Sequence, residues 1–163
     1  MSLLIGCGSF FGLRISDLLT LTWSMLLDNE KFVITEQKTG KRREIRVNCN
    51  FQKHIADCYK SLGVVDKNEK CFLSRKRTVY STQRINVLFK SMKSKYNLKI
   101  EHFSTHSMRK TFGRQVVEAA GENSEFALIK LSELFNHADI QTTRRYLGLR
   151  SQELLENYDM LNF

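Results

Sequence analysis

The spacing of apolar residues constrains this chain more than any other feature. They recur every three or four positions over most of the 163 residues, which is the period of an amphipathic helix. This period predicts helices over 15–21, 51–62, 82–96, 106–120, 128–135, 139–147 and 151–161. Between 31 and 48 the period shortens to two, which is typical of strands. The pattern therefore predicts a mainly α fold with a small antiparallel β-sheet, in the α+β class.

The alternating segment has the features of a β-hairpin with a basic tip. Gly40 supplies the turn, and the predicted inward-facing residues are Phe32, Ile34, Ile45 and Val47. A short third strand is expected over 71–73. Asn50 is predicted to cap the next helix and Gly63 to end it, while Ser81 or Thr82 begins the one after.

Length and composition predict a single domain. Proline is absent, there is no linker rich in Gly or Ser, and 42% of the residues are hydrophobic. No apolar run approaches the roughly 18 residues of a membrane span, and the N-terminus does not resemble a signal peptide. We therefore expect a cytoplasmic protein with no membrane partner.

The four cysteines lack the two-residue gap of a zinc or redox motif. They stand at positions 7, 49, 58 and 71, and we interpret them as buried free thiols. A metal site formed by Cys49, His54 and Cys58 is the weaker alternative, so no metal is predicted.

The charge is concentrated in one segment. Lys and Arg number 26 against 17 Asp and Glu, which gives a formal net charge of +9. From Lys70 to Lys99 there are nine basic residues and no acidic one, so the rest of the chain, with 17 of each, is neutral. Such a run is often a solvated helix face, but the imbalance also favours a polyanionic partner, nucleic acid before an anionic membrane.

Two arginines and a histidine stand out within the predicted helices. His106 and Arg109 are three residues apart and therefore share a helix face, which is often simply a polar surface. Arg14 lies between apolar neighbours at a helix start, where an ion pair with Asp17 is the ordinary explanation. Neither pattern is specific by itself.

Three further residues are equally ambiguous when taken singly. Lys38 at the hairpin tip is explained by solvation, and His137, between two helices, by capping. Tyr146 is explained as a half-buried aromatic residue. The order of all these residues along the chain carries more information than any one of them.

Taken in order, they resemble the tyrosine recombinase (phage integrase) family. GLRISDLLTLTW at 12–23 looks like the family's first arginine box, THSMRKTF at 105–112 like its second, and FNHADIQTTRRY at 135–146 like its final box. In the final box Asn136 replaces a turn glycine, and Asn tolerates left-handed backbone better than most residues. The resemblance covers nearly the whole chain and implies six catalytic positions: Arg14, Lys38, His106, Arg109, His137 and Tyr146.

The resemblance implies a role for each position and no cofactor. Tyr146 would attack the scissile phosphorus and form a 3′-phosphotyrosyl bond, while the two arginines would bind the non-bridging oxygens. His106 would transfer a proton near the nucleophile, and His137 would hydrogen-bond the same phosphate. Lys38 would protonate the departing 5′ oxygen.

It also implies double-stranded DNA as the partner and a site-specific recombinase or integrase as the function. The basic residues that we predict to contact its backbone phosphates are Lys41, Arg42, Arg43, Arg75, Lys76, Arg77 and Arg84. A type IB topoisomerase-like enzyme and a catalytically silent DNA-binding module of the same fold are the alternatives.

For the domains, we expect 1–163 to form one catalytic domain without the family's N-terminal DNA-clamping domain. Self-association is expected as a tetramer on DNA and a monomer alone. The last helix, within 150–163, is expected to pack either in cis or on a neighbouring subunit.

Overall fold

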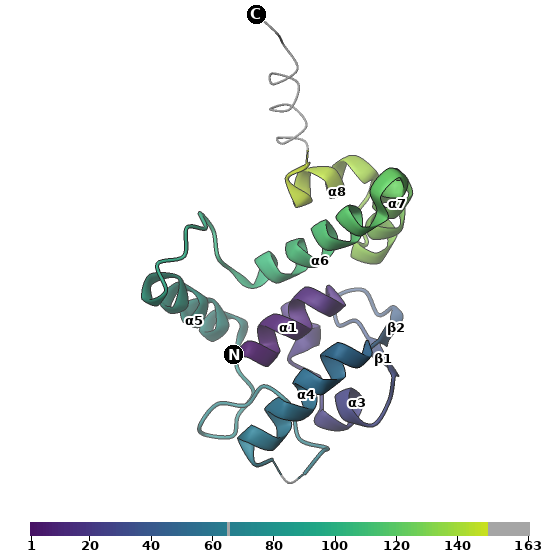
Figure 1. The fold of residues 1–163 in the computed structure, drawn as a ribbon. Coiled ribbons are helices and arrows are strands. Elements are labelled where there is room, and N and C mark those ends of the chain that lie inside the picture. Colours follow the sequence, from purple (N-terminus) through teal and green to yellow (C-terminus); the bar gives the residue numbers. More distant parts are fainter. Residues whose placement is uncertain (65, 150–163) are drawn as a thin grey trace, which may run out of the picture. The chain divides into compact units, whose positions relative to one another are not determined.

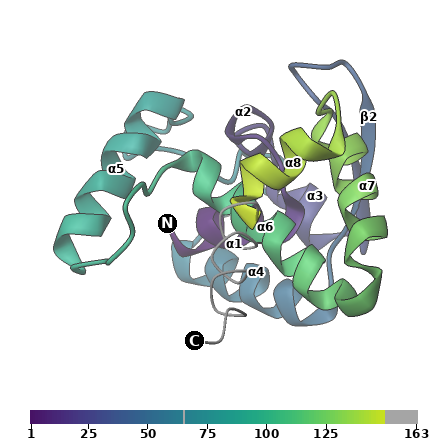
Figure 2. The ribbon, with the colours of Figure 1, turned by 90° about the horizontal axis from the view of Figure 1, so that it is seen from above.

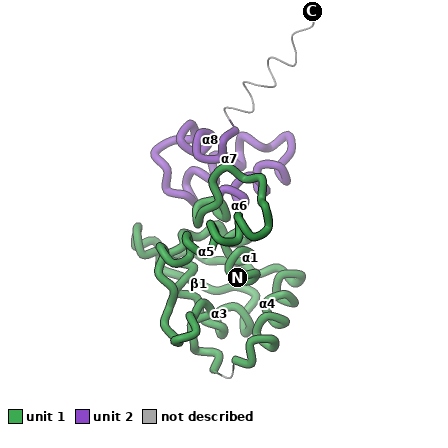
Figure 3. The backbone as a smooth tube through the Cα atoms, turned by 90° about the vertical axis from the view of Figure 1, so that its left-hand side faces the viewer, with its two compact units in different colours: residues 1–109 green, residues 110–163 purple. Residues whose placement is uncertain are grey.

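The chain folds into two compact units, Met1–Arg109 and Lys110–Phe163, which are described separately (Figure 3). The structure is a computed structural model, and it describes residues 1–64 and 66–149 (Figure 1). In this part of the chain it is mostly helical, with a small antiparallel sheet of two strands, as predicted.

Unit 1 holds the hairpin and most of the helices. Its elements are α1 (Ser2–Phe11), α2 (Ile15–Leu18), α3 (Trp23–Leu27), β1 (Lys31–Thr35), β2 (Arg42–Arg46), α4 (Cys49–Leu62), α5 (Thr82–Lys95) and the start of α6 (Thr105–Ala120). Helix α4 lies beside α1 and α3 (Figure 1). One core joins these elements, with Trp23, Ile55 and Phe89 among its fully enclosed side chains.

The hairpin forms as the alternation predicts. Strands β1 and β2 pair antiparallel, with Phe32 opposite Ile45 and Ile34 opposite Arg43. All four predicted inward residues are buried. Gly40 has a φ of 68° in the connecting segment, so the turn lies where the sequence indicates.

Three local predictions for unit 1 are wrong, each for a reason visible in the hydrogen bonds. The helix expected over 15–21 ends at Leu18, because the Thr20 hydroxyl and backbone N–H both bond to the Asp17 carbonyl. Asn48 caps α4 in place of Asn50, since its side chain accepts from the Phe51 N–H at 2.8 Å. The segment 71–73 forms only an isolated bridge, Leu73 to Val79, around the tight Ser74–Thr78 turn.

The remaining helix ends in unit 1 follow their signals. Gly63 ends α4 in the left-handed conformation, and the Ser81 side chain caps α5 by accepting from the Arg84 N–H. The helix expected over 82–96 ends at Lys95, and Tyr96, just past its end, is exposed. Helices α1 and α3 were not predicted at all.

Unit 2 consists of the later part of α6, a 3-10 turn η1 (Gly121–Asn123), α7 (Ser124–Phe135) and α8 (Ile140–Leu147) (Figure 2). Its core is formed by Leu128, Leu131, Phe135 and Leu147. Helices α6 and α8 approach closely: a Cβ on Gly113 would lie 2.5 Å from Leu147 Cδ2. The last predicted helix, over 151–161, lies outside the described residues.

The cysteines are only partly as predicted. Cys7 and Cys71 are buried, and burial raises the pKa of the Cys71 thiol to about 12. Cys49 is exposed at the first position of α4, and Cys58 is half-buried. None of the helices in the described part of the chain has the length and apolar character needed to cross a membrane.

Candidate active site

Arg14 lies at the junction between α1 and α2 and is held by an acidic residue from the hairpin. It is the N-cap residue of α2 and has extended backbone. Its Nη1 donates to Glu36 Oε2 at 2.7 Å, and its side chain is 20% exposed. The ion pair with Asp17 suggested by the sequence is not the pair that forms.

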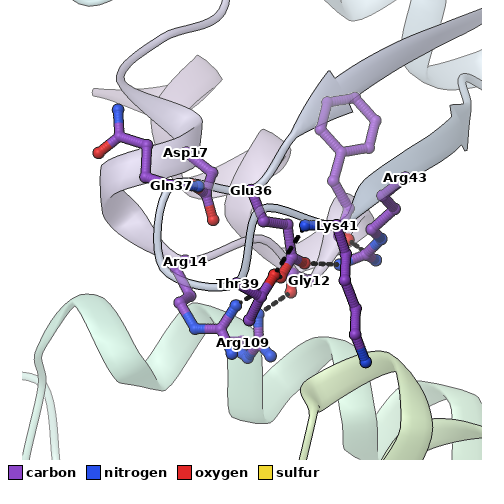
Figure 4. A network of polar contacts seen from close by, with 10 residues as sticks. Gly12, Arg14, Asp17, Glu36, Gln37, Thr39, Lys41, Arg43 and Arg109 are labelled. Carbon is purple, nitrogen blue, oxygen red and sulfur yellow. Dashed lines mark hydrogen bonds and ion pairs between the residues drawn. The ribbon is translucent and has the colours of Figure 1, made fainter.

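Glu36 is the centre of this polar network (Figure 4). It is 4% exposed and accepts from the Thr39 hydroxyl at 2.9 Å as well as from Arg14. Arg43 Nη1 lies 3.7 Å from its second oxygen. Burial acts to raise the pKa of Glu36, but the hydrogen bonds from Thr39 and Arg14 and the nearby positive charges outweigh it, so the pKa is lowered.

The turn that contains Lys38 is held by hydrogen bonds on both sides of this residue. The Gln37 N–H donates to the Asp17 carboxylate at 2.9 Å, and the Gly40 N–H donates to the Glu36 carbonyl at 2.8 Å. Lys38 itself is exposed in this turn. These hydrogen bonds hold the turn at the hairpin tip. Lys38 in this turn is two residues from Glu36, whose carboxylate binds Arg14.

Arg109 reaches the same stretch of chain from α6. It is 5% exposed, and its Nη1 donates to the Gly12 carbonyl at 2.8 Å, two residues before Arg14 (Figure 4). The start of α6 can approach α1 closely because Gly8 has no side chain, and a Cβ there would overlap Met108. His106 lies one turn earlier on α6 and is exposed.

In unit 2, aromatic and basic groups surround Tyr146. The centroid of its ring lies 5.2 Å from that of His137 and 5.7 Å from that of Phe135, with both pairs edge to face. Lys110 Nζ lies 5.5 Å from the same centroid. The half-buried phenol therefore shares its surroundings with an imidazole and an ammonium group.

Hydrogen bonds hold both His137 and the two ends of α8 in place. Asn136 adopts the left-handed conformation that ends α7, and the His137 N–H then donates to the Ser132 carbonyl. His137 Nδ1 lies 2.9 Å from the hydroxyl of Thr143, which is fully buried. Asp139 caps the start of α8, and Arg114 Nε donates to the Leu147 carbonyl at its end.

Comparison with known proteins shows the family of this chain. The sequence profile of the phage integrase family matches residues 7–153. This chain belongs to the phage integrase family.

Curated members of the family align with most of this chain. The probable integrase/recombinase YoeC of Bacillus subtilis strain 168 is 29% identical over 137 residues, which are 84% of this chain and 71% of YoeC. The tyrosine recombinase XerC of Xanthomonas campestris pv. campestris strain B100 is 26% identical over 148 residues, which are 91% of this chain and 44% of XerC. The chain therefore spans less than half the length of that XerC.

Solved structures in the family share the fold. The XerA recombinase superposes with a TM-score of 0.69 at 19% identity, covering 99% of this chain and 63% of XerA. A lambda integrase dimer bound to a COC′ core site gives a TM-score of 0.61 at 18% identity, covering 89% of this chain and 41% of the integrase chain. The mainly α fold with its small sheet is thus the phage integrase catalytic fold.

The predicted DNA contacts of this family member separate into exposed and enclosed residues. Lys41 and Arg42 are exposed on the hairpin, and Arg75, Lys76 and Arg84 line a hollow of about 750 Å³ at the start of α5. Arg77 is exposed and pairs with Glu69. Arg43 differs, because its side chain is 14% exposed and donates to the Phe11 carbonyl at 2.5 Å.

The six candidate residues fall into two groups. Unit 1 brings together Arg14 and Arg109 on the Gly12–Arg14 segment, with Lys38 on the adjoining hairpin and His106 on α6. Unit 2 brings together His137 and Tyr146. Sequence reasoning missed Glu36, which the alternation of the hairpin places on its buried face.

Proposed function

We propose that the protein is a site-specific DNA recombinase or integrase that cuts and rejoins double-stranded DNA through a 3′-phosphotyrosyl intermediate. The observation that supports the proposal most directly is the contact between the segment that contains Arg14 and the helix that contains Arg109. Arg109 donates to a residue 97 positions away, beside Arg14, although no local pattern links them. The names of the relatives YoeC and XerC support the same activity.

The paired arginines suit the charge that develops on a phosphodiester under attack. The diester has one negative charge, and a five-coordinate transition state concentrates more on its equatorial oxygens, where fixed donors have the largest effect. Guanidinium groups remain charged and can each bind two oxygens. Arg14 and Arg109 would supply this stabilisation.

Tyr146 would be the nucleophile. A phenol has a pKa near 10, so attack at neutral pH requires a proton acceptor or a positive environment. His106 would serve in this proton transfer, and His137 would hydrogen-bond the phosphate. In unit 2 the neighbouring His137 and Lys110 support such an environment.

The attack forms a bond between the phenol oxygen and phosphorus and breaks the bond to the 5′ oxygen. Lys38 would give the leaving oxygen its proton. The new bond is again a phosphodiester, so the reverse attack by a 5′ hydroxyl rejoins the strand without ATP.

The exposed basic residues would hold the duplex. Lys41, Arg42, Arg75, Lys76 and Arg84 present positive charge on the hairpin and at the start of α5. Binding through such residues releases counterions, so the affinity should fall steeply with salt. We also propose that the protein assembles as a tetramer on DNA and is a monomer alone, which light scattering with and without DNA would test.

The decisive experiment traps the covalent intermediate. The full chain is incubated in EDTA with a library of nicked duplexes of randomised sequence, and protein–DNA adducts are isolated on a denaturing gel and sequenced. We expect an adduct enriched in one site, and none with Tyr146→Phe. Adducts at every sequence together with plasmid relaxation would favour a topoisomerase, and no adduct would favour a silent binding module.

A further inference from the structure

Glu36 connects two parts of the candidate site that come from different elements. Its Oε2 accepts both from Arg14 Nη1 at 2.7 Å and from the Thr39 hydroxyl at 2.9 Å. Thr39 directly follows Lys38 in the hairpin turn. A single carboxylate oxygen therefore joins the first arginine to the turn that presents the lysine.

The main chain strengthens this connection. The Glu36 N–H donates to the Lys41 carbonyl at 3.0 Å, and the Glu36 carbonyl accepts from the Gly40 N–H at 2.8 Å. The turn is thus closed across Glu36 by its backbone as well as its side chain. Glu36 is therefore bonded both to Arg14 and to Thr39 in the Lys38 turn (Figure 4).

We propose that Glu36 is a positioning residue that aligns the Arg14 guanidinium and the Lys38 turn for strand cleavage. This proposal rests on the proposed function. Stabilisation of a transition state requires donors that are already fixed where charge develops, and a displacement of about 1 Å can reduce a rate by about 100-fold. Glu36 has the means to fix Arg14, because the carboxylate is buried and its bond to the guanidinium is charge-assisted.

The ionisation of Glu36 supports this role. Burial favours the neutral acid, but the hydrogen bonds from Thr39 and Arg14 and the charges of Arg14 and Arg43 reverse the effect and lower the pKa. The residue therefore remains a carboxylate at neutral pH and offsets the repulsion between two arginines.

The test measures single-turnover adduct formation on the site found with the duplex library. Glu36→Gln is expected to slow adduct formation by about 10- to 100-fold at saturating protein. It is not expected to weaken binding of the same duplex, since the variant removes a negative charge. Glu36→Asp keeps the charge but shortens the side chain by one methylene, so its rate of adduct formation should lie between those of the wild type and Glu36→Gln.

A matched control and a double variant separate positioning from general damage. Glu44 is on the same hairpin, 58% exposed and paired with Lys31, so Glu44→Gln should cleave at the wild-type rate. If part of the Glu36 effect acts through Arg14, then Glu36→Gln should slow the Arg14→Lys variant by a smaller factor than it slows the wild type. Melting curves of all variants report the fold independently.

The connection to Lys38 has its own test. Thr39→Val removes the hydroxyl that donates to Glu36, while Thr39→Ser keeps it. A duplex with sulfur in place of the bridging 5′ oxygen needs no proton on its leaving group, because thiols are far more acidic than alcohols. Thr39→Val should slow cleavage of the oxygen duplex severalfold, while Thr39→Ser and the sulfur duplex should restore the rate.

The outcomes distinguish the two proposals. If the wild-type chain forms no adduct that depends on Tyr146, the proposed function fails and the assignment of Glu36 fails with it. If the wild-type chain forms the adduct but Glu36→Gln cleaves at the wild-type rate, or its loss multiplies in full with that of Arg14→Lys, only the assignment of Glu36 is overturned. Should Glu36→Gln not fold, a wild-type rate for Thr39→Val on the oxygen duplex overturns it.

Discussion

Arg43 and Arg42 are neighbours on one strand, and the structure predicts opposite consequences of replacing them. Arg42 is exposed, while the Arg43 guanidinium is enclosed between the Phe11 carbonyl and Glu36. Burial lowers the pKa of Arg43, and the charge of Glu36 acts against this effect. Methionine is a suitable replacement at both positions, because it keeps the length and apolar part of the side chain.

The cost of Arg43→Met follows from the contacts it removes. The Phe11 carbonyl loses its 2.5 Å donor. An unsatisfied buried acceptor costs about 1–3 kcal/mol. Glu36 loses one of its two arginines but keeps Arg14, so the total should be about 2–4 kcal/mol. For a chain of this length, each kcal/mol lowers the melting temperature by about 2–4 °C, so a decrease of roughly 5–15 °C is expected.

Thermal unfolding and salt-dependent DNA binding provide the assay. Circular dichroism gives the melting temperatures, and fluorescence anisotropy with a labelled duplex gives affinity over a series of salt concentrations. Arg42→Met should melt like the wild type and reduce the salt slope by about one, as the loss of one phosphate contact predicts. An Arg43→Met variant with a normal melting temperature and a reduced slope would refute the structural role of Arg43.

Three further changes test the candidate site. Lys38→Ala should slow adduct formation by about 10²- to 10⁴-fold on an oxygen duplex but little on a 5′-bridging sulfur duplex, and equal losses on both would contradict its role as the acid. Thr143→Val removes the hydroxyl 2.9 Å from His137 Nδ1. It should slow adduct formation about tenfold and lower the free energy of unfolding by about 1–2 kcal/mol, as measured by thermal melting. An unchanged rate would show that another group orients His137. Gly113→Ala places a Cβ 2.5 Å from Leu147 Cδ2. Overpacking should destabilise the fold by about 1–3 kcal/mol, which outweighs the roughly 1 kcal/mol gained in helix propensity, and adduct formation should slow. A more stable and fully active variant would argue against close packing between α6 and α8.

The elements that local patterns encode were predictable from the sequence. The hairpin and the helices from α4 onwards follow periods of two and of three to four, since each buries one face. Helix α1 was missed because its exposed side also carries an apolar residue, Phe10, which hides the buried face of the helix. The N-cap residue of α4 was predicted two residues too far along the chain, because nothing in the sequence distinguishes Asn48 from Asn50 as a cap.

The candidate site was predictable through motifs but not through its contacts. The resemblance selected Arg14 and Arg109, yet the partner expected for Arg14 was Asp17, three residues away. Its actual partner, Glu36, is 22 residues away and is brought near by the hairpin. Short spacings predict neighbours on one helix, whereas this pair depends on how a strand packs beside a helix start.

One pattern in the hairpin did carry the missing information. Glu36 continues the inward-facing alternation of Ile34 by one step, and Arg43 precedes Ile45 in the same way on the other strand. Because strand side chains alternate strictly between faces, both charges must lie on the buried side near the turn. A buried acid and base there can be tolerated only if they pair, and that requirement argues against Arg43 as a phosphate contact. Charge counted along the sequence is therefore a weaker guide to DNA contacts than the face on which the alternation places each charge.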